Sequence, residues 1–183
     1  MKAGDFVFYK TNSVSGRLIR RLQKKLFGNR WEAEVNHIAF CVEAPDIMRE
    51  AKIPESFVAK DVDYKRKIVA IVRPTYLMIM QDDLKQEFFE EQKKIVGYSY
   101  GIQQIIGMWV WTALALFGIN LRTNPIRAGR ICTEDCFLAK KDMEMRAGFN
   151  DPINRKFINA DTIYPGYFLV LLGESNYYRV MRS

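Results

Sequence analysis

His37-Ile38-Ala39-Phe40-Cys41-Val42-Glu43 is the stretch of this 183-residue sequence that decides its fold. Its five central residues are all apolar, and a short apolar run bounded by polar residues is typical of a strand that is buried on both faces. The turn signal Ala44-Pro45-Asp46 follows, and Ile47–Ala51 is expected to continue the strand structure after the turn. The stretch therefore predicts a buried strand, and the single histidine of the chain stands at its start.

The segments around this strand predict an α+β fold. Aromatic and β-branched residues favour strands at 5–9, 57–62, 67–72 and 167–172. Helical spacing of apolar residues predicts helices at 13–28, 83–96 and 105–121, and the charge order after Cys132 predicts another at 132–141. Ser13 and Ser15 are both candidates for the N-cap of the first helix, which Gly28 should end. Because strands and helices gather in separate parts of the chain, we expect one α+β domain over residues 1–183.

Composition and charge restrict the class of protein and of partner. With 49% apolar and 13% aromatic residues, the chain can bury an ordinary core, which excludes disordered, collagen-like and disulfide-scaffold proteins. Lys and Arg exceed Asp and Glu by 28 to 21, so the net charge of +7 favours anionic partners such as wall polymers or anionic lipid. The basic residues form no recognised nucleic-acid motif, and we expect no nucleic-acid partner.

Cysteine content and hydropathy bear on location. Three cysteines cannot all pair within one chain and suit a reducing compartment, and the N-terminus has no signal-peptide pattern. We therefore expect a cytoplasmic protein. The uncharged segment 105–121 has 17 residues, fewer than the roughly 20 of a spanning helix. It predicts a buried or surface-docked helix, with membrane or partner contact as the alternative.

A cysteine nucleophile has one favourable position. Cys132 stands immediately before a predicted helix, and a helix N-terminus favours a thiolate and supplies backbone N–H donors for an oxyanion. Cys136 lies one turn further along the same face, and Cys41 lies within an apolar strand, so both suit core packing. The alternative is that Cys132 also packs in the core and has only a structural role.

His37 is the one histidine that can serve as a base for such a thiol. Glu43 shares its strand face, and Glu50 would reach it from the adjacent strand. A zinc site is the other use of these residues, because His37-x3-Cys41 and Cys132-x3-Cys136 offer four ligands. Structural zinc sites usually draw their cysteines from turns, whereas these lie on a strand and a helix, so we expect no metal.

A series of short motifs follows in a recognisable order. It comprises Gly4-Asp5, the serine-containing segment from Ser13 to Arg21, Asn36-His37-Ile38-Ala39-Phe40, Glu50-Ala51, Val72-Arg73-Pro74, the Gly-x-x-Tyr loop from Gly97 to Tyr100, and Cys132-Thr133-Glu134. In order and spacing the series resembles the circularly permuted NlpC-type (YiiX-like) papain-fold cysteine hydrolases. The chain departs from the usual family pattern at Gly101, Ile131 and Thr133, and none of these changes removes a catalytic group.

The resemblance implies a papain-like α+β fold with a central antiparallel sheet or barrel, and a site without a cofactor. It implies that Cys132 is the nucleophile, His37 the general base and Glu50 the third residue, ahead of Glu43. Tyr100 would line the site and assist the oxyanion.

The expected function is a cysteine amidase or peptidase that cleaves an amide, such as one in a cell-wall peptide, through a Cys132 thioester. A lipid acyltransferase or thioesterase of the lecithin:retinol acyltransferase type is the first alternative. The basic helix and the segment 105–121 favour it, and peripheral contact with an anionic membrane would accompany it. A non-catalytic binding module is the second alternative.

Overall fold

One antiparallel sheet forms the centre of the molecule in the computed structural model, which describes residues 1–45, 47–51, 56–60, 66–99, 101–119, 130–157 and 163–183. Its six strands lie in the order β4-β3-β2-β1-β5-β6, and all neighbours are antiparallel. The strands are β1 (Phe6–Lys10), β2 (His37–Glu43), β3 (Ile47–Ala51), β4 (Ser56–Lys60), β5 (Lys67–Pro74) and β6 (Tyr178–Arg182). The expected α+β class is confirmed.

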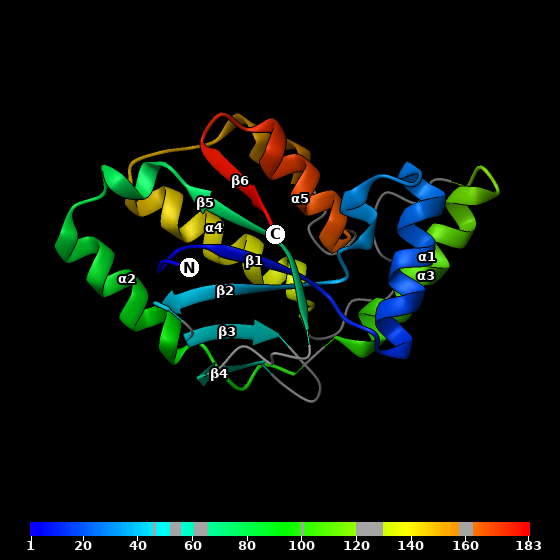
Figure 1. The fold of residues 1–183 in the computed structure, drawn as a ribbon, viewed down its shortest axis with the longest axis horizontal. Coiled ribbons are helices and arrows are strands. Elements are labelled where there is room, and N and C mark those ends of the chain that lie inside the picture. The colour runs from blue at the N-terminus through cyan, green and yellow to red at the C-terminus, as the bar shows by residue number, and fades with distance from the viewer. Residues whose placement is uncertain (46, 52–55, 61–65, 100, 120–129, 158–162) are drawn as a thin grey trace.

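Helices cover one face of the sheet and both of its ends. Figure 1 shows α4 running across the sheet, α2 at one end of the molecule, and α1 with α3 at the other. The helices are α1 (Val14–Phe27), α2 (Asp82–Lys94), α3 (Ile102–Leu116), α4 (Cys132–Arg146) and α5 (Pro165–Glu174), with 3-10 turns at Trp31–Glu34, Tyr76–Met78 and Pro152–Phe157. The sequence therefore places Cys132 at the first residue of the helix that crosses the sheet.

The alternation of side chains along the strands divides the core in two. In β1, Phe6 and Phe8 belong to the large cluster that includes Cys136 of α4, whereas Val7 and Tyr9 belong to a smaller cluster on the other face. All four β1 residues are fully buried. The central strands are thus covered on both faces, as the apolar run in β2 predicts.

A buried polar cluster fixes α4 against the sheet. Arg49 of β3 is 1% exposed, and its guanidinium donates to the Asp135 carboxylate over 3.1 Å and to the Asp135 carbonyl over 3.0 Å. It also donates to Gln92 of α2 and lies 5.8 Å from the centroid of the Phe40 ring. Because Asp135 lies in the first turn of α4, this cluster sets the position of the helix start beside β3.

The predicted limits of α1 are confirmed at both ends. The Ser13 hydroxyl accepts a hydrogen bond from the Gly16 backbone N–H over 3.1 Å, so Ser13 rather than Ser15 is the N-cap. Gly28 follows the helix with a φ of 77°, a conformation that glycine adopts without strain.

The strand predicted at residues 167–172 is wrong, because these residues belong to α5. A short apolar run has the same appearance in a strand and in a buried helix. Pro165 begins the helix at a position where proline is favoured, and Gly166 donates its N–H to the Gln23 side chain over 2.7 Å. A side chain at Gly166 would meet the Glu32 carbonyl oxygen at 2.2 Å, so only glycine allows this approach. The last strand is β6, which the prediction missed.

The apolar helix predicted at 105–121 is present as α3, but it begins three residues earlier and ends at Leu116, so the predicted helix is wrong at 117–119. The positions after 119 lie outside the described residues. Among the residues that the structure describes, no helix has the length and apolar character needed to cross a membrane.

Replacing Arg49 by leucine is expected to destabilise the protein strongly. The Asp135 carboxylate would stay buried without its cation, and breaking a buried ion pair costs about 3–5 kcal/mol of unfolding free energy. Urea titration at pH 7 measures this loss. Lys85→Ala is the matched control, because Lys85 pairs with the exposed Asp82 and exposed pairs contribute little. Equal urea midpoints for the two variants would contradict the structural role of Arg49.

Candidate active site

His37 lies at the start of β2, next to a residue that links this strand to β1. Asn36 accepts from the Thr11 backbone N–H and donates to the Thr11 carbonyl, each over 2.8 Å, which links the start of β2 to the end of β1. His37 is the next residue and lies opposite Tyr9 in the register of the two strands. The strand pairing therefore fixes the position of the His37 backbone. The His37 side chain is 12% exposed.

Glu50 reaches the imidazole from the adjacent strand, as the sequence predicts. Its carboxylate lies 3.1 Å from His37 Nε2, and Arg66 donates to the same oxygen over 2.6 Å. Glu50 is 3% exposed. Burial alone raises the pKa of Glu50, but the hydrogen bonds from His37 and Arg66 outweigh it and lower the pKa to about 2. The carboxylate is thus ionised and holds the Nε2 side of the ring.

Cys132 approaches the imidazole from the helix that crosses the sheet. Burial alone lowers the pKa of His37, whereas hydrogen bonding to Cys132 and Glu50 raises it, to about 9. Since Nε2 faces Glu50, the other ring nitrogen is the one left for the thiol. The structure therefore brings together Cys132, His37 and Glu50, and the ring is protonated at neutral pH.

The start of α4 adds a favourable electrostatic environment for a sulfur or oxygen anion. Ile131 occupies the N-cap position and provides no side-chain hydrogen bond to the first turn. Backbone N–H groups at a helix start lack intrahelical partners, and the helix dipole favours negative charge there. Cys132 is the first helical residue and is 5% exposed, so its thiol lies at this uncapped end.

Tyr9 and Arg66 complete the surroundings of the histidine, and sequence reasoning missed both. The Tyr9 ring centroid lies 6.1 Å from that of His37, and the Arg66 guanidinium lies 5.8 Å from the Tyr9 ring. The Tyr9 hydroxyl is buried and has no hydrogen-bond partner among the described residues, and burial raises its pKa. The alternation in β1 would have indicated Tyr9, whereas no pattern around Arg66 distinguished it from the other basic residues.

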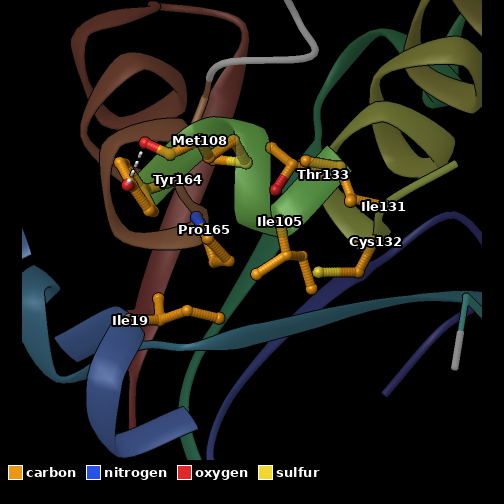
Figure 2. Close-up of a pocket in the computed structure, with 8 residues that line it drawn as sticks. All are labelled: Ile19, Ile105, Met108, Ile131, Cys132, Thr133, Tyr164 and Pro165. Carbon is orange, nitrogen blue, oxygen red and sulfur yellow. Dashed lines mark hydrogen bonds between the residues drawn. The ribbon is translucent and has the colours of Figure 1, made fainter. Parts of the chain in front are cut away.

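An apolar pocket adjoins the thiol. Figure 2 shows the Cys132 sulfur on its wall, close to Ile105, with Thr133 on the same helix. The pocket encloses about 20 Å³, space for about one water molecule, and its lining is almost entirely apolar. The Thr133 hydroxyl is buried and has no hydrogen-bond partner in the described part of the chain. The residues that line it are Ile19, Ile105, Met108, Ile131, Cys132, Thr133, Tyr164 and Pro165.

Two of the predicted site residues are not brought to the histidine. Glu43 lies at the opposite end of β2, about 20 Å along the strand at ~3.3 Å per residue. It is exposed and pairs with Lys93 over 2.7 Å. The alternative third residue is therefore wrong: sharing a strand face with His37 does not place Glu43 near it. Tyr100 lies outside the described residues.

The other two cysteines pack in the core as predicted. Cys41 belongs to the small cluster and Cys136 to the large one, on opposite faces of the sheet. Burial raises the pKa of Cys136 well above its ordinary value. The zinc alternative would need Cys41 and Cys136 at one site, but they lie on opposite faces of the sheet. The described residues contain no group of three or more His, Cys, Asp or Glu placed to hold a metal ion.

Comparison with models of known protein families finds no match, and comparison with curated proteins finds no significant relative. The chemistry of the site therefore has to be inferred from its geometry.

Replacing Glu50 by glutamine is expected to lower the pKa of His37 from about 9 towards its ordinary 6.5, because the variant removes the negative charge beside Nε2. With one histidine in the chain, a proton NMR titration gives a single curve. Glu43→Gln is the matched control and should leave the curve at about 9. Unchanged titration in Glu50→Gln, or an equal shift in the control, would refute the assignment.

The raised pKa of His37 makes the free energy of unfolding depend on pH. The folded-state pKa of His37 exceeds the ordinary value, so its stabilising contribution is fully present below about pH 6.5 and disappears as pH rises through about 9. The urea midpoint of the wild type should fall across this range, and Glu50→Gln should reduce the fall.

Proposed function

We propose that the protein is a cysteine hydrolase of the permuted papain-like type, an amidase or peptidase that forms a thioester on Cys132. The observation that carries the proposal is the sequence of contacts from Cys132 to His37 to Glu50. A thiol, an imidazole and an orienting carboxylate in this order are the minimum for cysteine-based acyl transfer. The buried position of Glu50 and its bond to Arg66 favour an orienting role, since its low pKa keeps it ionised.

In the first half of the reaction, the proton shared by Cys132 and His37 resides on the imidazole, so the sulfur is free to act as the nucleophile. The sulfur attacks the carbonyl carbon of the substrate, and a tetrahedral oxyanion forms. The Cys132 backbone N–H, at the uncapped start of α4, donates to this oxyanion. The C–N bond then breaks, His37 gives its proton to the leaving amine, and the acyl group remains on sulfur.

In the second half, His37 takes a proton from water, and the resulting hydroxide attacks the thioester carbon. The C–S bond breaks, the carboxylic acid leaves, and the proton returns to the sulfur of Cys132. Glu50 keeps the ring oriented through Nε2 in both halves. No group other than water is required to complete the cycle.

A lipid acyltransferase or thioesterase is the second candidate function, and one observation favours it. The pocket beside Cys132 is lined by aliphatic side chains from α1, α3 and the segment before α4, together with Tyr164 and Pro165. Such a surface suits an acyl chain better than a wall peptide, whose polar groups would lose hydrogen bonds there. The chemical steps on Cys132 are the same, and only the leaving group and acceptor differ.

Iodoacetamide is expected to alkylate Cys132 in the folded protein at pH 7 and to leave Cys136 unmodified. Cys132 lies beside His37 at the start of α4, whereas burial raises the pKa of Cys136. Peptide mass spectrometry measures both rates. His37→Ala should slow the reaction at Cys132 by about tenfold or more, and Cys136→Ala should not change it. A Cys132 that reacts no faster than Cys136 would favour a non-catalytic binding module.

Substrate preference separates the two enzymatic candidates. If an acyl chain extends along this apolar surface, kcat/KM for p-nitrophenyl esters should rise about fourfold for each added methylene that the surface buries, from ~0.8 kcal/mol per buried CH₂. If the protein is a wall amidase, it should cleave a muropeptide amide and show no such rise. Both activities should vanish in Cys132→Ala and persist in Cys136→Ala. Unchanged activity in Cys132→Ala would exclude Cys132 as the nucleophile.

A further inference from the structure

Helix α3 exposes several large apolar side chains to solvent. Its solvent side presents Ile102, Ile106 and Val110 at four-residue spacing, with exposures of 47%, 43% and 42%. The side that faces the protein carries Gln104, which donates to Glu134, and Thr112, which donates to the Met108 carbonyl. A helix on a water-exposed surface normally shows the opposite arrangement.

The apolar face continues past the end of the helix. Phe117 is 84% exposed and Ile119 is 51% exposed, and neither is on the buried side. We name Ile102, Ile106, Val110, Phe117 and Ile119 the apolar stripe. Large apolar side chains exposed together along one element indicate a site of interaction.

Helix α1 has a basic stripe at the same spacing. Arg17, Arg21 and Lys25 recur every four residues and are all exposed. Within Val14–Phe27 five residues are basic and none is acidic. Glu34 pairs with Lys24 and Arg20, but no ion pair joins the three stripe residues to an acid among the described residues. We name these three the basic stripe.

The two helices share one end of the molecule. Ile19 and Leu22 of α1 pack with Ile105 and Met108 of α3 in one apolar cluster, and Figure 1 shows the two helices together at the end farthest from α2. Packed helix axes lie about 8–10 Å apart. A ligand for this end therefore meets exposed basic side chains on α1 and exposed apolar side chains on α3.

We propose that the α1–α3 end binds the surface of an anionic lipid bilayer. The interface of such a bilayer offers phosphates to the basic stripe and acyl chains to the apolar stripe. Helix α3, about 22 Å long at 1.5 Å per residue, would lie in the plane of the interface. An acidic protein or nucleic acid would satisfy the basic stripe but would leave the apolar stripe in water.

Docking in this way brings the pocket to the bilayer. Ile19 belongs to α1 and Ile105 and Met108 belong to α3, so the two helices that bind the surface also line the pocket of Cys132. An acyl chain of a membrane lipid would have a short path to the thiol. This last step rests on the proposed function, whereas the docking surface does not.

Sedimentation with vesicles tests the proposal. The probes are vesicles of phosphatidylcholine with 30% phosphatidylserine and vesicles of phosphatidylcholine alone, each at 0.1 M and 0.5 M NaCl. The wild type should bind the anionic vesicles at low salt, and high salt should weaken binding because it screens the basic stripe. Absence of binding at 0.1 M NaCl would overturn the proposal, as would equal binding to neutral vesicles at both salt concentrations.

Variants identify the surface. Removing the basic stripe (Arg17→Gln, Arg21→Gln and Lys25→Gln together) should lower the partition coefficient about 100-fold. Ile106→Glu with Val110→Glu should abolish binding. The matched control removes three exposed charges elsewhere, with Lys94→Gln, Lys141→Gln and Arg179→Gln. All substituted residues are exposed, and far-UV circular dichroism checks that the fold is kept. Equal loss in the control would overturn the assignment.

Two further measurements separate this proposal from its rivals. Cys132→Ala should bind vesicles as the wild type does, so the docking surface and the chemistry can fail independently. Analytical ultracentrifugation tests whether α3 instead joins a second copy. A dimer that Val110→Glu dissociates, in a protein that binds no vesicle, would replace the lipid surface with a protein interface and overturn the proposal.

Discussion

The buried contact between Arg49 and Asp135 is the constraint on which the candidate site depends. Arg49 precedes Glu50 on β3, and Asp135 lies one turn after Cys132 on α4. The contact therefore holds the strand that carries the carboxylate and the helix that carries the thiol at one fixed separation. His37 lies on β2, the strand that pairs with β3, and is the third residue of the candidate site. A buried ion pair adds little to stability compared with apolar packing, but it defines position more narrowly.

Several motifs that carry the family resemblance have structural roles. The Asp5 carboxylate accepts two hydrogen bonds from the Arg73 guanidinium, each over 2.8 Å, and joins β1 to β5. Asn36 ties the start of β2 to β1. These residues support the sheet and do not touch the candidate site. The motifs of the resemblance therefore include residues that support the fold. Only their positions in the structure separate them from the residues of the candidate site.

The sequence was sufficient for the elements whose signals are local. The N-cap of α1, the strand at His37 and the helix start at Cys132 all follow from short patterns of charge and hydropathy. Prediction failed where tertiary contacts decide. The apolar run of α5 became a helix because Gly166 packs directly on Glu32, and Arg66 reached Glu50 from a position with no distinguishing pattern. The exposed apolar face of α3 could not be predicted either, because a uniformly apolar segment has no preferred face until it packs.

The placement of Arg66 on Glu50 has a consequence for the electrostatics of the proposed cycle. With a thiolate and an imidazolium, the four groups at the site carry two negative and two positive charges. Once Cys132 is acylated and His37 has given up its proton, the ionised pair of Glu50 and Arg66 remains, and the sum is again zero. The catalytic groups therefore return to neutrality at each stable stage. A nearly enclosed site of this composition requires no counterion to enter or leave during turnover.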